Sequence, residues 1–310
     1  MTNKESLHPT ILPVDTSWRA FLDMLVVLFK LRVVSLLLLA AVGGAFLGAG
    51  GWPGLGNLLL VLVTGGMAAS GASALNQYIE RSSDVIMSRT RLRPLPTGAI
   101  ARPRLVVAIG VALIALPSLA VLPTNPALSF YLLLGAFIYV GVYTIWLKPR
   151  TLLNIVIGGA AGSAAVMSGG AAVGAAGDPA VIALALLIFL WTPSHFWSLA
   201  ILYKDDYARA DVPMLPVHVT LRQAALWVFL HTAATGLVAL LLGVTPALGW
   251  SYLLPVVLAT VDLFARNVRL IAEPTPQNAR TLFIASNIYL TIVLLGILIS
   301  SVLHNAWALL

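Results

Sequence analysis

Long apolar stretches, each about the length that crosses a lipid bilayer, recur along almost the whole chain. An α-helix satisfies its own backbone hydrogen bonds, so an apolar stretch of roughly 17–25 residues is expected to span the membrane as a helix. The sequence therefore predicts an all-α protein, a polytopic membrane bundle of nine transmembrane helices. The expected spans are residues 33–50, 55–79, 104–122, 127–147, 153–173, 179–202, 223–244, 247–266 and 281–303.

The composition agrees with a membrane protein and excludes several kinds of site. Only 9% of the 310 residues are charged and 60% are hydrophobic, whereas a soluble domain carries about 25% charged residues. The chain contains no cysteine. Disulfide bonds, thiolate metal sites and a cysteine nucleophile are therefore excluded.

Positive charge gives the bundle an orientation. The 18 lysine and arginine residues precede the first span or border the loops after the second, fourth, sixth and eighth spans, which share one side of a nine-span layout. The opposite loops, 51–54, 123–126, 174–178 and 245–246, contain none. Because positive residues accumulate on the cytoplasmic side, we expect a cytoplasmic N-terminus and a periplasmic C-terminus. The net charge of +7 then reflects topology, and no nucleic-acid binding is expected.

The N-terminal segment shows no targeting signal. It is polar, includes Glu5 and Asp15, and has no cleavable apolar core, so it resembles neither a secretory signal nor a transit peptide. A multi-pass protein of a bacterial cell inner membrane is the simplest interpretation. We expect a cytoplasmic N-terminal segment over residues 1–32 and a single transmembrane domain over residues 33–310.

A polar stretch follows the second span and carries the most informative residues. Asn76, Glu80 and Asp84 recur every four residues, and on a helix this spacing places all three side chains on one face. A basic loop with two prolines, Pro94 and Pro96, comes directly after them. Hard oxygen ligands followed by guanidinium groups suit a divalent cation that holds a phosphate ester. We therefore expect Mg²⁺ at this face.

A second acidic loop follows the sixth span. Asp205 and Asp206 lie there and are candidates for a second metal ion that a diphosphate bridges to the first. Acids of this kind also occur simply as solvated helix ends, but two such loops on one side of the membrane, each beside basic residues, favour ligands. The candidate diphosphate-binding residues are Arg81, Arg89, Arg93, Lys148, Arg150 and Lys204, with Arg89 and Arg93 preferred.

Two histidines fall inside predicted spans at matched depth. His195 lies nine residues before Lys204, and His231 lies nine residues after Arg222. Imidazoles at this depth could face a metalloporphyrin, and we take His195 as a candidate haem-binding residue. The alternative is a histidine satisfied by a neighbouring serine or threonine, which is the preferred interpretation for His231. Aromatic residues near the same rim, Tyr207 among them, suit a membrane interface or an allylic cation.

The motifs together resemble a known family. The pattern N-x₃-E-x₃-D-x₂-M-x-R-T-x₂-R-P-L-P-x-G, from residue 76 to 98, resembles the first motif of the UbiA-type intramembrane prenyltransferases. With YTIWLKPRTLLNIVIGGAAG (143–162), FLWTPSHFWSLAI (189–201) and KDDYARADVPMLPV (204–217), the chain is similar to the protohaem IX farnesyltransferases, or haem O synthases, within that family. It departs from the usual pattern in four ways: Glu80 replaces an Asp, Leu31 replaces the Pro of the usual Lys-Pro-Arg before the first span, Asp211 replaces a Gly, and Ser163-Ala164-Ala165 stands where a Pro pair usually follows GGAAG.

The resemblance implies a UbiA-type fold and a prenyltransferase activity. It implies that the farnesyl group of farnesyl diphosphate is joined to a vinyl group of protohaem IX, giving haem O for terminal oxidases. Mg²⁺ would be the cofactor, with haem as a substrate. The expected partners are farnesyl diphosphate, protohaem IX and the lipid bilayer, with haem A synthase or oxidase assembly proteins as further candidates.

Two other functions fit parts of the sequence. A prenyltransferase that acts on a quinone-precursor ring would use the same two acidic loops, so those loops do not separate it from a haem enzyme. A transporter is disfavoured, because transporters usually keep ionisable residues near the membrane midplane and no Lys, Arg or Glu lies mid-span here. Asp262 stands four residues before Arg266, which predicts a helical ion pair.

Overall fold

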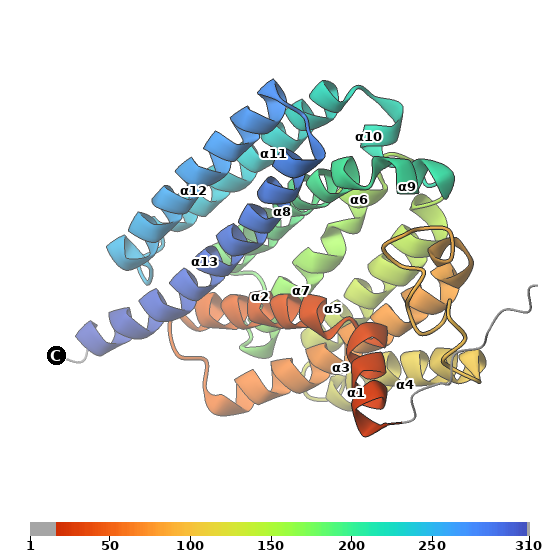
Figure 1. Cartoon of the computed structure of the whole chain (residues 1–310). Coiled ribbons are helices and arrows are strands. Elements are labelled where there is room, and N and C mark those ends of the chain that lie inside the picture. The colour runs from red at the N-terminus through yellow and green to blue at the C-terminus, as the bar shows by residue number, and fades with distance from the viewer. Residues whose placement is uncertain (1–16, 309–310) are drawn as a thin grey trace, which may run out of the picture.

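The computed structural model describes residues 17–308 as a helical bundle with no strand in that range (Figure 1). Three helices are short or peripheral: α1 (Trp18–Leu28), α9 (Lys204–Arg209) and α10 (Leu215–His218). The long segments are α2 (Leu31–Ala49), α3 (Leu55–Asp84), α4 (Pro103–Val121), α5 (Pro126–Phe137) with the π-helix η1 (Ile138–Leu147), α6 (Asn154–Gly158) with α7 (Ala160–Ala172), α8 (Pro179–Leu202), α11 (Leu221–Leu242), α12 (Gly249–Ala272) and α13 (Pro276–Ala308).

The predicted spans coincide with these long segments. Eight of the segments found in residues 17–308 are long and apolar enough to cross a membrane, which confirms an all-α, multi-pass membrane bundle. The eighth predicted span, 247–266, corresponds to α12, which is helical but less apolar because it carries polar residues at its start and Asp262 and Arg266 further on. The span count of nine therefore stays a prediction, close to what the structure shows.

Small residues allow the helices to approach closely. In α3, a Cβ on Gly71 would lie 2.5 Å from the carbonyl oxygen of Gly110 in α4. The tightest crossing joins α2 and α7, where a Cβ on Gly169 would lie only 1.7 Å from the carbonyl oxygen of Ala41. No side chain fits at such a position without moving a backbone, so these glycines set the helix spacing.

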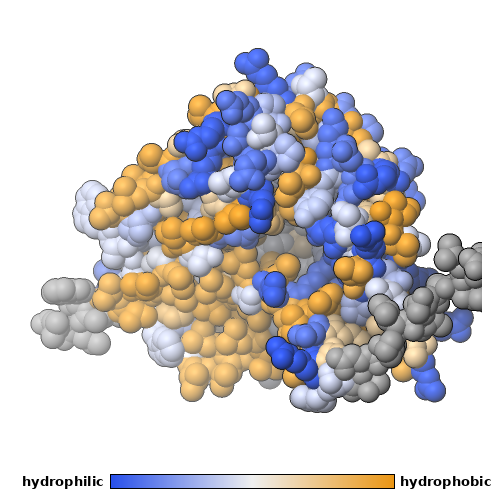
Figure 2. Space-filling view, viewed as in Figure 1, coloured by the Kyte–Doolittle hydropathy of each residue, from blue (hydrophilic) through white to orange (hydrophobic). Residues whose placement is uncertain are grey.

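The two predicted polar loops lie at the same end of the bundle. Figure 1 shows the segment after α3 close to α9 and α10, whereas the last turns of α13 lie at the opposite end. Hydrophilic side chains gather towards the loop-bearing end of the face in Figure 2, and hydrophobic ones cover the other end. Large apolar side chains such as Leu116, Phe137 and Leu254 are exposed on the surface, as expected for a face that meets lipid.

Candidate active site

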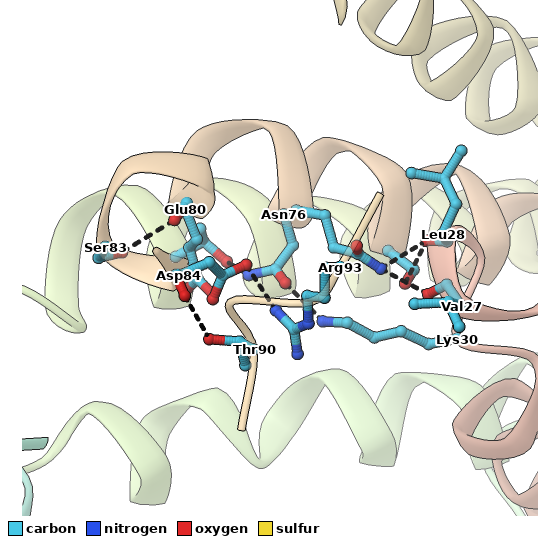
Figure 3. A network of polar contacts seen from close by, with 12 residues as sticks. Val27, Leu28, Lys30, Asn76, Glu80, Ser83, Asp84, Thr90 and Arg93 are labelled. Carbon is cyan, nitrogen blue, oxygen red and sulfur yellow. Dashed lines mark hydrogen bonds and ion pairs between the residues drawn. The ribbon is translucent and has the colours of Figure 1, made fainter. Parts of the chain in front are cut away.

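The end of α3 carries the three residues predicted to bind metal. The helix runs through Asp84, beyond the predicted end of the span at residue 79. Asn76, Glu80 and Asp84 therefore share one helical face, as predicted. Figure 3 shows them turned towards Lys30 and Arg93. Asn76 and Asp84 are buried and Glu80 is half-buried, so the site lies below the surface of the bundle.

Each of these three side chains contacts a basic group of the protein. Lys148 pairs with Glu80 at 2.5 Å, and Arg93 pairs with Asp84 at 2.7 Å. The third member, Asn76, accepts a hydrogen bond from Lys30 through Oδ1 at 2.5 Å. The structure thus places two of the predicted diphosphate ligands directly against two of the predicted metal ligands. An acidic cluster of this kind is stable in a low-dielectric site because its charge is balanced.

Lys30 is a site residue that sequence analysis missed, because its charge had been assigned to membrane topology. It lies between α1 and α2, and its ammonium group contacts Asn76 and the hydroxyl of Tyr139, the latter at 3.0 Å. Burial and then the positive charge of Arg93 lower the pKa of Lys30 to about 7, although Glu80 opposes this shift. The family's usual Lys-Pro-Arg pattern was the signal that could have identified Lys30.

The π-helix η1 forms the wall opposite α3. Its backbone hydrogen bonds join residues five apart, as the Lys148 N–H does to the Tyr143 carbonyl at 2.8 Å. The side-chain hydroxyl of Thr144 donates to the Tyr139 carbonyl at 2.8 Å. Thr144 also accepts from Nδ2 of Asn76 at 2.9 Å. Tyr139 and Tyr143 stack with ring centroids 5.8 Å apart, and Lys148 follows directly after the helix. One widened helix therefore supplies a hydroxyl, two phenol rings and a cation to the same site.

The second acidic loop is joined to the first through Asp206. This buried carboxylate accepts hydrogen bonds from the backbone N–H of Ser88, at 3.0 Å, and from its hydroxyl, and it also pairs with Arg209. Ser88 belongs to the loop after α3, so the two loops predicted to face each other are in contact. Asp205 is exposed on α9. Its role at the metal, like that of Asp206, stays a prediction.

Asp211 explains one departure from the family pattern. Its φ of 52° lies in the left-handed region, where a glycine is favoured and Asp is one of the better-tolerated alternatives. An aspartate can therefore occupy, in this conformation, the position where the family usually has a glycine. Leu31 is a similar case, since it is the first residue of α2, where a proline also fits.

The remaining predicted diphosphate ligands occupy different surroundings. Arg89 lies over the Tyr203 ring at 5.9 Å, on the side where the two loops meet. Arg81 stacks on Tyr78 at 4.3 Å and donates to its carbonyl, and Arg150 donates to two carbonyls near the end of η1. Lys204 begins α9 and is half-buried. The structure therefore brings Arg93 and Lys148 against the acids, whereas Arg81 and Arg150 serve local helix ends.

Tyr207 presents a buried hydroxyl that is available to a ligand. Its side chain is 1% exposed, and its hydroxyl has no hydrogen-bond partner among residues 17–308. Tyr143 lies near enough to interact with it electrostatically. An unpartnered buried hydroxyl is costly, so a bound substrate is a natural partner for it. Sequence analysis had placed Tyr207 only among the aromatic residues of the rim.

His195 is held in a stack of aromatic rings between α8 and α13. Trp191 and Phe283 cover its two faces at centroid distances of 4.3 and 4.4 Å. Its Nδ1 lies 2.7 Å from the Ser286 hydroxyl, the kind of serine contact that sequence analysis had preferred for His231. Since Nδ1 is engaged, Nε2 is the nitrogen that remains for a ligand. His231 instead meets Trp197 edge-on at 5.3 Å.

The oxygen ligands on the α3 face could bind Mg²⁺ only together with further ligands from a substrate. No cluster of three His, Asp or Glu side chains able to hold a metal occurs within residues 17–308. The α3 face supplies two carboxylates and one amide oxygen. Mg²⁺ is commonly held by one or two carboxylates together with substrate phosphates and water. The residues present therefore fit an ion that arrives with a diphosphate.

Comparison with known sequences gives a consistent result. Residues 36–308 match the model of the UbiA prenyltransferase family. The protoheme IX farnesyltransferase of Metallosphaera sedula is 41% identical over 273 residues, which cover 88% of this chain and 94% of that protein. Protoheme IX farnesyltransferase 2 of Paramagnetospirillum magneticum is 38% identical over 291 residues, covering 92% and 99%.

Solved structures share the fold at low sequence identity. A structure of digeranylgeranylglyceryl phosphate synthase superposes with a TM-score of 0.75 at 16% identity, over 91% of this chain and 98% of that one. The apo structure of a UbiA homologue from Aeropyrum pernix K1 gives 0.69 at 18% identity, over 86% and 98%. A UbiA homologue from Archaeoglobus fulgidus bound to GPP and Mg²⁺ gives 0.58 at 17%, over 88% and 99%.

Proposed function

Because the chain belongs to the UbiA prenyltransferase family and, within it, to the protoheme IX farnesyltransferases, we propose that it transfers the farnesyl group of farnesyl diphosphate to a vinyl group of protohaem IX and so makes haem O. The structural observation that carries this proposal is the α3 face. There, oxygen donors and basic groups meet in pairs, as the binding of a metal diphosphate requires.

Asn76, Glu80 and Asp84 would hold Mg²⁺, with Asp205 and Asp206 as candidates for a second ion. A UbiA homologue of the same fold has been solved with GPP and Mg²⁺, which supports this assignment. When bound, Mg²⁺ neutralises the charge of the leaving diphosphate. Arg93 and Lys148 now neutralise the same carboxylates, and they would turn to the phosphate oxygens instead. Arg89 would approach from the adjoining loop, while Arg81, Arg150 and Lys204 are weaker candidates.

The reaction breaks the bond between C1 of the farnesyl chain and the diphosphate oxygen, which keeps the electron pair. The π electrons of the haem vinyl group then form the new carbon–carbon bond. Water adds its oxygen to the resulting porphyrin-side cation and releases a proton. In this chain, the stacked rings of Tyr139 and Tyr143 lie beside the acids, where their faces would stabilise the allylic cation and exclude water from it.

His195 is proposed to position the haem acceptor. Trp191, Phe283 and Ser286 fix its ring and engage Nδ1, as is common for a histidine whose other nitrogen meets a metal. We expect His195→Ala to weaken haem binding by at least about tenfold while farnesyl diphosphate binding changes little. Titration of the purified protein with haem, followed by its absorption spectrum, tests this. An unchanged spectrum and affinity would leave His195 with a packing role.

The acceptor separates this proposal from a quinone-precursor prenyltransferase. Haem is a large anionic disc whose propionates need basic partners at the rim, and its iron can meet a histidine. A small phenolic acceptor needs neither. Membranes that contain the protein, supplied with protohaem, Mg²⁺ and farnesyl diphosphate, are expected to form a haem with the mass of a hydroxyethylfarnesyl product, and chelation of Mg²⁺ should abolish it. A prenylated quinone precursor beside unmodified haem would contradict the substrate assignment.

We further propose a cytoplasmic N-terminus and a periplasmic C-terminus in a bacterial inner membrane, because the basic loops share one side of the layout. Reporter fusions after Leu310 and within residues 270–278 are expected to report opposite sides. Both reporters on one side would mean that α13 does not cross, and would contradict nine spans. If α12 is instead the helix that does not cross, the two reporters should exchange sides, with the reporter at 270–278 periplasmic and the one after Leu310 cytoplasmic. Haem A synthase and oxidase assembly proteins would act on or receive the product on this membrane.

A further inference from the structure

The junction between α1 and α2 turns sharply into the active site. α1 ends at Leu28 and α2 begins at Leu31, and Lys30 between them has φ 48° and ψ 45°. This left-handed conformation is unfavourable for a residue with a Cβ and persists only when the surroundings impose it. Lys30 and Asp211 are the two non-glycine residues with positive φ in the part of the chain that the structure describes.

A buried glutamine of α3 holds this junction. Nε2 of Gln77 donates to the carbonyl oxygens of Val27, at 2.6 Å, and Leu28, at 2.9 Å. Ser73, one turn earlier on α3, donates to the Leu28 carbonyl at 3.4 Å. The last carbonyls of a helix lack α-helical partners within it. The Val27 carbonyl also accepts from the Lys30 backbone N–H at 3.2 Å, and Gln77 adds a cap supplied by another helix. Gln77 is fully buried, and solvent therefore cannot replace it.

The same turn of α3 holds the other end of Lys30. Asn76 precedes Gln77 in the chain, and its Oδ1 accepts a hydrogen bond from the Lys30 ammonium group at 2.5 Å. Figure 3 shows the Lys30 side chain reaching towards Asn76 from the end that Val27 and Leu28 occupy. Gln77 thus fixes the backbone beside Lys30, while Asn76 and Tyr139 receive its side chain. The lysine can reach the acidic face only because α1 stops where it does.

We propose that Lys30 binds the diphosphate of the prenyl substrate and that Gln77 is the positioning residue that directs it there. This inference rests on the proposed function. A metal ion on Asn76 Oδ1 would repel the ammonium group that now lies 2.5 Å from the same oxygen, so we expect the ammonium group to move to the diphosphate when a metal diphosphate binds. A lysine has a flexible four-carbon stem, which lets the charged end shift to a phosphate oxygen while the capped backbone stays in place.

The test is a double-variant cycle on the full-length purified protein, with the non-hydrolysable farnesyl thiodiphosphate as probe. Lys30→Met and Gln77→Met keep an unbranched side chain of similar length and remove the charge or the two N–H donors. Each is expected to weaken probe binding by at least about tenfold, with Mg²⁺ present and with Mg²⁺ chelated. In the double variant, the loss should not exceed that of Lys30→Met alone, because Gln77 acts through Lys30.

The controls separate positioning from general damage. Arg19→Met removes a positive charge from an exposed position of α1 and should bind the probe as the wild type does. If Gln77→Met does not fold, Ser73→Ala removes one weaker bond to the same junction and should lower affinity about twofold, but not in the Lys30→Met background. Losses that multiply in the double variant, or wild-type binding by Lys30→Met, would overturn the inference. Failure of the wild type to bind the probe would instead count against the proposed function.

Discussion

Replacement of Asp84 by asparagine is expected to lower farnesyl transfer by at least about 100-fold while the amount of folded protein in the membrane stays normal. The substitution keeps the shape of the side chain and removes one negative charge from the buried α3 face. Glu80, the one acid left on that face, would bind Mg²⁺ diphosphate more weakly, and groups that stabilise a developing charge typically contribute 10²–10³ in rate. Product formation under saturating substrate measures the effect.

Asp262→Asn is a matched control for this variant. Asp262 also pairs with an arginine, Arg266, at 2.7 Å, but it lies exposed on α12 away from the acidic face. We expect near-normal turnover, because an exposed ion pair contributes little to stability. A rate for Asp84→Asn within a few-fold of wild type would remove Asp84 from the metal site. Loss of the protein from the membrane would instead show that the Asp84–Arg93 pair is needed for folding.

Gly169→Ala is expected to prevent normal assembly of the bundle. A Cβ at this position would lie 1.7 Å from the carbonyl oxygen of Ala41 and 2.7 Å from its carbon. Both are backbone atoms, so α2 and α7 would have to move apart along their whole contact. Overpacking of this kind costs typically 1–3 kcal/mol and more when backbone must shift. We expect a large loss of folded protein and a lower melting temperature in detergent.

Gly66→Ala provides the comparison, because the nearest atom to its added Cβ is a side-chain carbon of Leu38 at 3.6 Å. That is an ordinary contact, and alanine is a better helix former than glycine. The expected melting temperature is equal to or above that of the wild type. Equal stability of the Gly169 and Gly66 variants would mean that α2 and α7 are not held at the spacing the structure shows.

Much of the site could be predicted from short-range spacing. Asn76, Glu80 and Asp84 fall on one face because a helix fixes that geometry whatever surrounds it. The distribution of positive charge placed both polar loops on one side, and the contact between Ser88 and Asp206 agrees with that placement. The Asp262–Arg266 pair was predicted on the same grounds and is confirmed. The prediction of the shared helical face and that of the Asp262–Arg266 pair depend only on residues a few positions apart in the sequence.

What could not be predicted depends on partners distant in the sequence. Lys30 and Asn76 are 46 residues apart in the sequence. A lysine just before a membrane span can set the orientation of the protein as readily as it can take part in catalysis, so the sequence alone did not indicate a role at the site. The serine contact of His195 comes from α13, 91 residues away. Tertiary packing alone determines which basic residues meet the acids. Arg93 and Lys148 pair with them, whereas Arg150 bonds carbonyls at a helix end. Residues 1–16, which include Lys4, lie outside the described part of the chain.

The π-helix η1 makes the site sensitive to how this span is wound as well as to its composition. In an α-helix, residues five apart point about 140° away from each other, whereas the π-helical bond from the Lys148 N–H to the Tyr143 carbonyl keeps these two residues on one side. A substitution within residues 138–147 that restored ordinary helical winding would leave the hydropathy of the span almost unchanged. It would turn Lys148 away from Tyr143, however, and so away from Glu80. Apolar substitutions that a hydropathy profile treats as neutral are therefore not neutral in this helix.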